Sequence, residues 1–297
     1  MILATLIALI VFLSSYKSHQ NSQKSIAQNQ TSQTNPTEEE LANDTQAENQ
    51  QEDNILDTAS IPTSNTLPAN GYSRQKVSVG SGLFTVSLVA GNLNSTRVIV
   101  DTASDSSCRN DCPVLSLKDY VTRSGAYAGV NGSYFCPATY PSCSGKKNSF
   151  DTLLMNKKKV YFNSDNNVYS TVPAVIFSGN SARFVGQSLE WGRDTGVDAV
   201  IANYPLLVRD GNINFTSASD GKLTGRGNRS FVGSKDNIAY IGVVQKATVA
   251  EVAQVLQAMG MKNALNLDSG GSTALWSGGY KFGPGRAIPN AILFTLK

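Results

Sequence analysis

Histidine is almost absent from this sequence of 297 residues, and the only one, His19, lies in a polar N-terminal stretch. The rest of the chain therefore has no imidazole. This absence excludes Ser-His-Asp and Cys-His nucleophilic sites, and it excludes zinc sites with histidine ligands. Acid, base and nucleophile roles must fall to carboxylates, Arg, Lys, Tyr or hydroxyl groups.

Glycine and cysteine are missing from residues 1–70, and residues 17–70 also lack Phe, Trp and Tyr. Residues 17–70 are rich in Gln, Asn, Ser and Thr, so they have too little apolar area to offset the entropy lost on ordering. We predict that they form a disordered polar linker. Residues 1–70 hold two lysines and eight acidic residues, a net charge of −6, so residues 71–297 carry +9 of the chain's total of +3.

The first 16 residues are uncharged and mostly apolar, whereas a full membrane span needs roughly 20 residues. Residues 1–16 therefore predict a signal peptide or a signal anchor. No pair of small residues precedes a suitable cleavage point, which favours the uncleaved anchor. A buried helix of the folded domain is the alternative. The anchor would be the protein's only contact with a membrane.

Residues 71–297 hold every glycine and cysteine and both tryptophans, and they are numerous enough to build one large core. Short apolar runs alternate with Gly, Asn, Asp and Ser, which is typical of strands and turns. The pattern predicts a single α+β domain with a mixed, strand-rich sheet and a few packed helices. The predicted strands are residues 83–89, 97–100, 172–177, 199–202, 206–209, 238–244, 264–267 and 291–296.

One helix is clearly signalled. Thr248 and Glu251 can form a capping box before an apolar pattern of helical spacing, and Gly260 suits a left-handed stop. This helix lies between two predicted strands, and the second of them ends at Asp268. Ligands bind at the strand ends of such units. A shorter helix is predicted over residues 117–123.

Four cysteines, Cys108, Cys112, Cys136 and Cys143, lie within 36 residues of one another. Two disulfides are predicted, with three possible pairings, of which the two local pairs would each close a loop. A zinc site with four thiolates is the alternative, although only the first pair has a usual ligand spacing. Disulfides would place the domain outside the cytoplasm, either secreted or periplasmic, or at the cell surface.

The segment of residues 266–273 is the most informative stretch of the chain. Asn266 and Asp268 lie two residues apart on a predicted strand, so their side chains share one face. The following Gly270, Gly271 and Ser272 allow the backbone to approach a ligand, and their N–H groups can hold an anion or a sugar hydroxyl. A turn with a capping aspartate is the alternative interpretation.

Two arginines, Arg226 and Arg229, are flanked by glycines in a segment that we expect just before a strand. Guanidinium groups match two phosphate oxygens at once, so this pair suggests a phosphate clamp. Exposed structural arginines are the alternative.

Asn131 and Gly132 follow an apolar run and could lie beside a sugar together with Tyr134. A hairpin next to a disulfide is the alternative. The basic clusters at residues 146–147 and 157–159 lack the interleaved aromatics of a surface that binds single-stranded nucleic acid, so no nucleic-acid partner is expected.

Taken in order, these stretches resemble the phosphodiester glycosidase family from about residue 127 to residue 296. The resemblance is carried by Asn131-Gly132 with Tyr134-Phe135, Pro205-Leu206-Leu207-Val208-Arg209-Asp210-Gly211, Gly225-Arg226 with Arg229 and Gly233, Asn266-Leu267-Asp268 with Gly270-Gly271-Ser272, and Arg286 with Asn290-Ala291-Ile292. The sequence departs from the family pattern at Ser133, Asn203-Tyr204, Ser230-Phe231 and Ser269.

The resemblance implies hydrolysis of a glycosyl phosphodiester, or of a related phosphate-containing saccharide, to the free sugar and a phosphate monoester. Asp268 would be the nucleophile or the base for water. Arg226 and Arg229 would neutralise the departing phosphate, and Arg286 would add a charge. No cofactor is required, although a divalent metal stays open. The expected substrate-positioning residues are Asn131, Gly132, Asn266, Gly270, Gly271 and Ser272.

Two further functions stay open at this point. The same cleft could belong to an envelope polysaccharide-binding module that performs no turnover. It could also belong to a metal-assisted phosphodiesterase that cleaves the P–O bond instead of the C–O bond.

Overall fold

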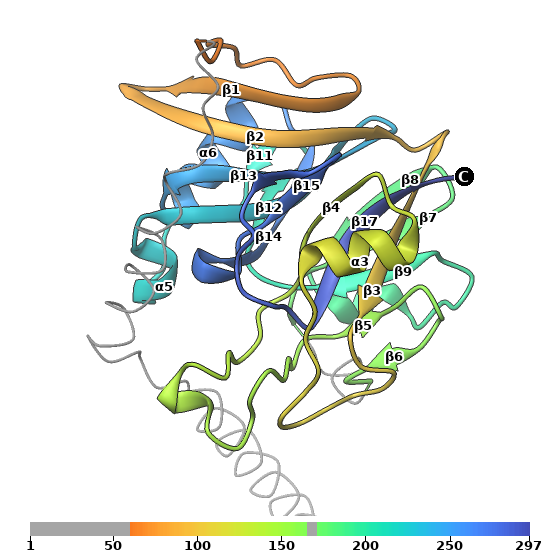
Figure 1. The fold of residues 1–297 in the computed structure, drawn as a ribbon. Coiled ribbons are helices and arrows are strands. Elements are labelled where there is room, and N and C mark those ends of the chain that lie inside the picture. Colours follow the sequence, from red (N-terminus) through yellow and green to blue (C-terminus); the bar gives the residue numbers. More distant parts are fainter. Residues whose placement is uncertain (1–59, 165–170) are drawn as a thin grey trace, which may run out of the picture. The chain divides into compact units, whose positions relative to one another are not determined.

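The structure is a computed structural model that describes residues 60–164 and 171–297 (Figure 1). The predicted signal segment, residues 1–16, lies outside the described residues, as does the predicted linker up to residue 59. Within the described part, no helix is both long enough and apolar enough to cross a membrane.

The described strands form three sheets. The first sheet has the order β1 (Gly71–Val79), β2 (Gly82–Asn92), β13 (Ile238–Ala247), β12 (Gly227–Lys235), β14 (Asn263–Ser269), β10 (Leu206–Arg209) and β11 (Asn212–Ile213). The second sheet has the order β16 (Tyr280–Phe282), β15 (Leu275–Ser277), β4 (Ala128–Asn131), β17 (Asn290–Leu296) and β3 (Thr96–Thr102). The third sheet has the order β6 (Tyr161–Phe162), β5 (Leu154–Met155), β9 (Ala199–Ala202), β7 (Ala174–Ser178) and β8 (Ser181–Val185).

The predicted α+β class, with many strands and few helices, is confirmed. All eight predicted strands are present with small shifts at their ends. Neighbouring strands in the three sheets pair antiparallel. An isolated parallel bridge joins Thr63, outside the named strands, to Lys76 of β1.

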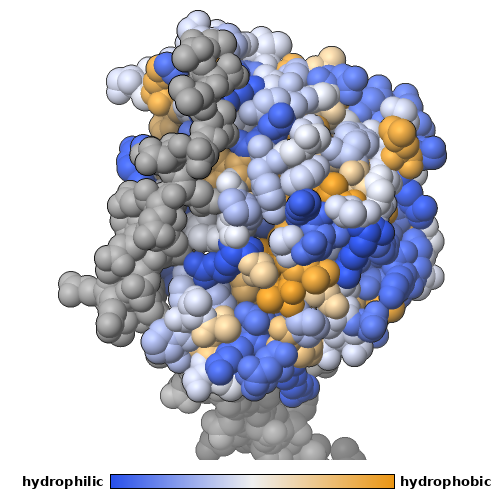
Figure 2. All heavy atoms as spheres, in the orientation of Figure 1, coloured by the Kyte–Doolittle hydropathy of each residue, from blue (hydrophilic) through white to orange (hydrophobic). Residues whose placement is uncertain are grey.

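The main hydrophobic core lies between the three sheets, because all of them contribute buried side chains to it. Alternation along β17 illustrates how the sequence achieves this: Ile292 and Phe294 enter the main core, whereas Ala291 and Leu293 enter a smaller cluster on the other face. The face shown in Figure 2 is accordingly mostly hydrophilic, with a smaller hydrophobic area near its centre.

Helices cover the outer faces of two sheets. Helix α6 (Val249–Ala258) packs on the first sheet and begins with the predicted capping box, in which Thr248 Oγ1 accepts from the N–H of Glu251. Helix α3 (Leu117–Ser124) packs on the second sheet. The short helix α5 (Gly221–Thr224) precedes β12. Three 3-10 turns are also described: η1 (Pro141–Cys143), η2 (Ser188–Trp191) and η3 (Gly270–Ser272).

Strand β12 corrects one expectation. The segment of residues 225–233 was expected just before a strand, but residues 227–235 form a central strand between β13 and β14. The arginine and glycines at its start gave the segment a loop-like composition. Pairing with a strand on each side outweighs this low intrinsic strand propensity.

Four strands bring their ends to one edge of the first sheet. Strands β13 and β14 both run antiparallel to β12, so their carboxyl ends lie beside its amino end. Strand β10 runs antiparallel to β14 and adds its own amino end. In the register, Gly227 pairs with Ala247 and Arg229 pairs with Ser269. We refer to this edge, with residues 203–206, 225–229, 247 and 266–269, as the site edge.

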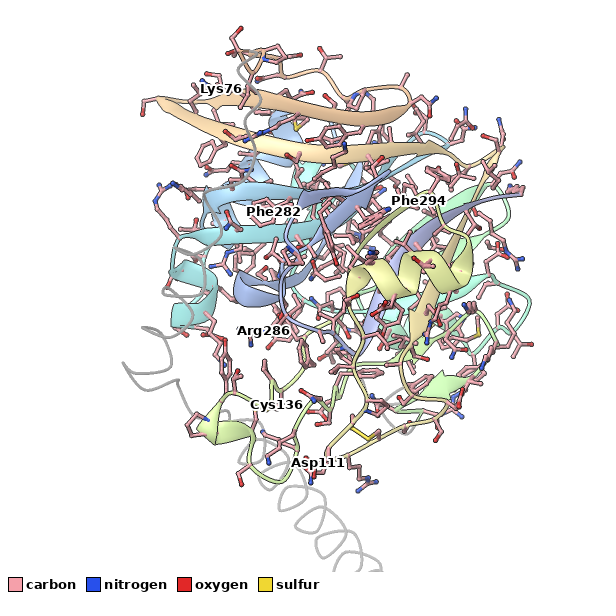
Figure 3. All side chains as sticks on the ribbon, in the orientation of Figure 1. Lys76, Asp111, Cys136, Phe282, Arg286 and Phe294 are labelled. Atoms are coloured by element: carbon pink, nitrogen blue, oxygen red, sulfur yellow. A yellow bond between two sulfur atoms is a disulfide. The ribbon has the colours of Figure 1, made fainter. Side chains whose placement is uncertain are left out.

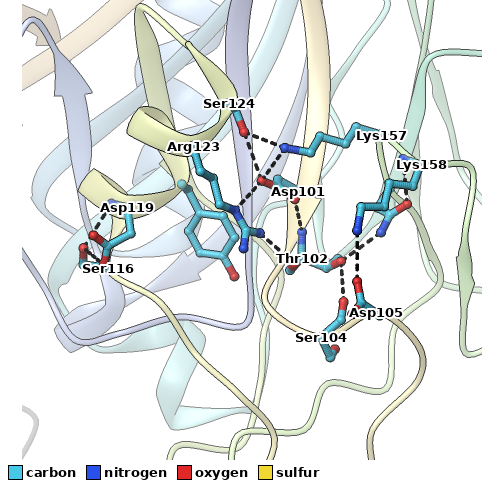
Figure 4. Close-up of polar contacts among 12 residues, drawn as sticks. Asp101, Thr102, Ser104, Asp105, Ser116, Asp119, Arg123, Ser124, Lys157 and Lys158 are labelled. Carbon is cyan, nitrogen blue, oxygen red and sulfur yellow. Dashed lines mark hydrogen bonds and ion pairs between the residues drawn. The ribbon is translucent and has the colours of Figure 1, made fainter.

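A buried ion cluster joins α3 to the second sheet (Figure 4). Asp101 on β3 is 3% exposed, and its carboxylate accepts from Arg123 Nε at 2.8 Å and from Lys157 Nζ at 2.9 Å. Ser124 Oγ donates to the same oxygen at 3.0 Å. Burial by itself would raise the pKa of Asp101, but the hydrogen bonds and charges of Arg123 and Lys157 outweigh it and hold the pKa below 3.8.

Candidate active site

The tip of β14 carries Asp268, whose side chain is partly exposed at the site edge. Its Oδ1 accepts from the backbone N–H of Ser269 at 2.9 Å. Its own backbone N–H donates to the carbonyl oxygen of Gly132 at 2.9 Å. The backbone of Asp268 is therefore fixed against the segment that follows β4, as its predicted role requires.

Asn131 is fully buried and makes its hydrogen bonds inside the protein. Its Nδ2 donates to the carbonyl oxygen of Asp268 at 2.6 Å, and its Oδ1 accepts from Ser230 Oγ at 2.7 Å and from the N–H of Ala274 at 3.1 Å. The amide of Asn131 therefore orders the site from inside the protein, and its predicted part in positioning the sugar stays a prediction.

The side chain of Asn290 packs closely against the backbone of Gly132. A Cβ at this position would overlap the side-chain oxygen of Asn290, which also accepts from the N–H of Ser133 at 2.9 Å. Asn290 is 1% exposed. The structure therefore explains the glycine by packing against Asn290 and not by space for a ligand.

Asn266 lies beneath two tyrosines and is fully buried. Its Nδ2 donates to the phenol oxygen of Tyr134 at 2.5 Å and to the carbonyl oxygen of Tyr204 at 3.1 Å. Its Oδ1 is buried and has no hydrogen-bond partner among the described residues. Asn266 and Asp268 share one strand tip as predicted, but the tyrosines separate Asn266 from the surface.

Tyr134 is partly exposed and connects the predicted site residues. Its ring meets the ring of Tyr204 edge-on, with centroids 5.0 Å apart. Burial raises the pKa of the Tyr134 phenol, and the negative charge of Asp268 and the neighbouring Tyr204 raise it further. The positive charge of Arg229 opposes this rise. Asp268 and Arg229 thus both act on one phenol, which remains protonated at neutral pH.

Arg229 projects from β12 and is 8% exposed. Its Nε donates to the carbonyl oxygen of Ala247 at 3.2 Å, and its Nη2 donates to that of Gly225 at 2.5 Å. Because β12 pairs Arg229 with Ser269, this guanidinium belongs to the same edge as Asp268.

Arg226 has different surroundings. Its Nη1 donates to the carbonyl oxygen of Lys246 at 3.0 Å, and its Nη2 forms an ion pair with Glu251 at the start of α6. It lines a cavity of about 550 Å³ together with Gly82 and Gln254. The two arginines of the predicted clamp therefore have different partners: Arg229 bonds only to backbone carbonyl groups among the contacts described above, whereas Arg226 also pairs with Glu251 of α6.

The turn after Asp268 is the 3-10 turn η3, in which Gly270 has a φ of +61° that favours glycine. Gly271 has no room for a side chain because the Arg286 guanidinium packs over it. The N–H of Arg286 also donates to the carbonyl oxygen of Gly271 at 2.8 Å. Ser272 is buried at the end of the turn. The expected residues Gly270, Gly271, Ser272 and Arg286 are therefore brought together.

The loop after β4 contacts Arg286, and Figure 3 labels this arginine together with Cys136 of the loop. The Arg286 guanidinium lies over the Tyr140 ring, 5.0 Å from its centroid, and Nη2 donates to the Tyr140 hydroxyl at 3.4 Å. Tyr140 lies inside the loop closed by the Cys136–Cys143 disulfide. No local sequence signal predicts the contact between Tyr140 and Arg286.

The cysteines form two local disulfides, Cys108–Cys112 and Cys136–Cys143. Two disulfides are confirmed, and the alternative zinc site is excluded because all four sulfur atoms are paired. Across residues 60–164 and 171–297, no three His, Cys, Asp or Glu side chains converge in a manner that could hold a metal ion.

Two site residues were not identified from the sequence as functional. Asn203 Oδ1 accepts from the N–H of Tyr134 at 3.0 Å, and its Nδ2 donates to the carbonyl oxygen of Asn266 at 2.8 Å. Tyr204 supplies the second aromatic ring. Both lie close before the predicted strand at residues 206–209, and that position was the available signal. Phe231, the other departure near the site, is fully buried under α6.

The sequence matches the phosphodiester glycosidase family over residues 124–295. No curated protein matches the chain significantly.

Two solved structures show the same fold. One is the catalytic domain of zebrafish N-acetylglucosamine-1-phosphodiester alpha-N-acetylglucosaminidase, described as auto-inhibited by its pro-peptide, with a TM-score of 0.57 and 13% identity over 80% of this chain and 87% of that one. The other is a hypothetical protein from Synechocystis, with a TM-score of 0.53 and 13% identity over 76% of this chain. The match spans 62% of the Synechocystis chain.

Proposed function

Because the chain belongs to the phosphodiester glycosidase family, we propose that it hydrolyses a glycosyl phosphodiester, releasing the sugar and leaving a phosphate monoester. One observation carries this proposal. Arg229 on β12 pairs with Ser269, the residue after Asp268, so a cationic and an anionic residue lie at the same strand ends, and both charges act on the phenol of Tyr134. A carboxylate and a guanidinium at one site suit a reaction in which a sugar becomes positive and a phosphate departs.

Asp268 acts at the anomeric carbon in this proposal. An oxocarbenium-like transition state carries positive charge on the sugar, and a carboxylate stabilises it either by direct attack or by activating water. The fixed backbone of Asp268, tied to Gly132, supports this role because a nucleophile or base must be held in a productive geometry.

Arg229 receives the departing phosphate. Its planar group of N–H donors matches phosphate oxygens, and two of these donors are anchored on backbone carbonyls of Ala247 and Gly225. Arg286 adds a second positive charge next to the glycines of η3. This proposal does not use Arg226, because its guanidinium pairs with Glu251.

The chemistry does not need a histidine. A phosphate monoester is already a good leaving group, so its departure requires less general-acid assistance than that of an ordinary alcohol. The barrier is lowered instead by charges that are preorganised around the breaking bond.

Two disulfides fit a reaction outside the cytoplasm. We propose that the substrate is a phosphate-containing saccharide of the cell envelope and that residues 1–16 anchor the chain near it. The zebrafish relative is described as acting on an N-acetylglucosamine phosphodiester, and this substrate is the first to test.

The test uses the full chain and a panel of glycosyl phosphodiesters, with separate assays for free sugar and phosphate ester. Hydrolysis in oxygen-18 water should place the label in the sugar. Label in the phosphate would instead identify a phosphodiesterase, and binding without turnover would identify a polysaccharide-binding module. Asp268→Asn should lower kcat by roughly 10² to 10⁴-fold with the fold intact. Asp105→Asn, whose side chain is 92% exposed, is the matched control.

A further inference from the structure

The phenol of Tyr134 has a hydrogen-bond donor that the protein does not use. Its oxygen accepts from Asn266 Nδ2 at 2.5 Å, which fixes the position of the hydroxyl. Within the described part of the chain, the phenol donates to no protein group. The O–H therefore has a hydrogen bond left to donate, and Tyr134 as a residue is partly exposed at the site edge.

The phenol lies near both charged groups that the proposed reaction uses. Asp268 and Arg229 act on it with opposite sign. Two backbone contacts agree with this placement. The N–H of Asp268 donates to the carbonyl oxygen of Gly132, which lies two residues before Tyr134. Arg229 pairs with Ser269, the residue after Asp268. A group that is close to the carboxylate at the sugar and to the guanidinium at the phosphate lies where the bond between them breaks.

We propose that Tyr134 is a further catalytic residue, whose O–H donates a hydrogen bond to the oxygen that bridges the anomeric carbon and phosphorus. The inference rests on the proposed function. The C–O bond breaks, and its electron pair stays on this oxygen, which leaves with the phosphate monoester. Water supplies the hydroxyl group to the anomeric carbon, and its proton passes to Asp268 and then to solvent. Tyr134 keeps its proton throughout.

Holding the proton is consistent with the surroundings of the phenol. Burial and the nearby Asp268 raise its pKa, so it is a poor acid but a stable neutral donor. A hydrogen bond that strengthens as charge develops on the bridging oxygen lowers the barrier without proton transfer.

The buried amide below Tyr134 becomes a positioning group in this interpretation. Asn266 uses both Nδ2 protons to hold Tyr134 and Tyr204, while its Oδ1 stays buried without a partner. An unsatisfied buried acceptor costs about 1–3 kcal/mol. Asn266 keeps this unfavourable buried oxygen directly below the phenol, which fits a role in orienting the phenol of Tyr134.

The test compares Tyr134→Phe with the wild-type full chain on a series of sugar-1-phosphodiesters whose alkyl, phenyl and nitrophenyl groups make the departing phosphate progressively less basic. We expect kcat to fall by roughly 10²-fold for the alkyl ester, with KM little changed, because the lost contact belongs to the transition state. The loss should shrink as the departing phosphate becomes less basic. Tyr127→Phe, which removes a hydroxyl bound to Thr96 away from the site edge, is the matched control.

Activity of Tyr134→Phe within twofold of the wild type would overturn the inference. An equal loss across the whole series would also overturn it, because it would indicate a structural role. Failure of the wild-type chain to hydrolyse any glycosyl phosphodiester would overturn the proposed function, and it is distinguishable because it requires no variant.

Discussion

Asn131 Nδ2 donates to the backbone oxygen of Asp268 at 2.6 Å, which joins positions that are 137 residues apart in the sequence. The other end of the same amide accepts from Ser230 and Ala274. One buried side chain therefore connects β4, β12, the tip of β14 and the residues before β15. The geometry of Asp268 depends on this connection.

Asn131→Ala should remove a hydrogen-bond partner from three polar groups: the backbone oxygen of Asp268, the hydroxyl of Ser230 and the N–H of Ala274. We expect the free energy of unfolding to fall by about 2–4 kcal/mol, since each such group costs about 1–3 kcal/mol before relaxation. Urea denaturation measures it. Asn212→Ala, at an exposed position, should change it by less than about 0.5 kcal/mol. Equal stability of Asn131→Ala and wild type would contradict this account.

Arg229→Lys and Arg226→Lys should behave differently. Lysine cannot reproduce the planar donor group, so Arg229→Lys should lower kcat/KM by roughly 10²-fold. Arg226 makes a surface ion pair with Glu251, a type of contact that contributes about 0–1 kcal/mol, so its variant should stay within threefold of wild type. Steady-state kinetics on one glycosyl phosphodiester measures both. Comparable losses of kcat/KM in the two variants would instead support the predicted phosphate clamp of two arginines.

The ion cluster at Asp101 should make the protein sensitive to acid. The pKa of Asp101 is lower in the folded protein than the ordinary value of 3.8. Its contribution to stability is therefore complete above the unfolded-state pKa, and it is lost as the pH falls below about 4 toward the folded-state pKa. Urea denaturation from pH 6 to pH 3 should show the free energy of unfolding decreasing in the acid range.

Asp101→Asn is the variant that checks this origin. The substitution should remove part of the decrease in the free energy of unfolding at acid pH. At neutral pH it should lower the free energy of unfolding by about 2 kcal/mol. This is less than the ~3–5 kcal/mol for a fully buried pair, because Arg123 and Lys157 are 36% and 26% exposed. If the free energy of unfolding of the variant fell with pH as steeply as that of the wild type, other carboxylates would be the cause of the acid sensitivity.

The two disulfides should differ in their effect on activity. Replacing Cys136 and Cys143 by serine opens the loop that carries Tyr140, so Arg286 loses the ring that it packs against. We expect a lower kcat/KM and a loss of about 2 kcal/mol of stability, as estimated for a short loop. The matched change at Cys108 and Cys112 should reduce stability but leave kcat/KM within twofold. If both pairs affected kcat/KM equally, the contact with Tyr140 would not be the cause.

Much of the fold could be predicted because its signals are local. The capping box of α6 involves Thr248 and Glu251, three residues apart, and the alternation along β17 needs only seven residues. Period-two patterns and caps act within a few residues, so they are legible without tertiary information. The pairing of each cysteine with its nearest neighbour is similarly local.

The sequence by itself determined that the domain has no imidazole, that Asn266 and Asp268 share one strand tip and that a glycine turn follows them. Only the tertiary structure decided that Asn131 and Asn266 are buried supports, that Arg226 turns to Glu251 and that Tyr134 lies near Asp268 and Arg229. The physical reason is that a polar side chain takes its role from partners that reach it through folding. For Asn131 and Asn266 several of these partners lie 62 to 143 positions away in the chain.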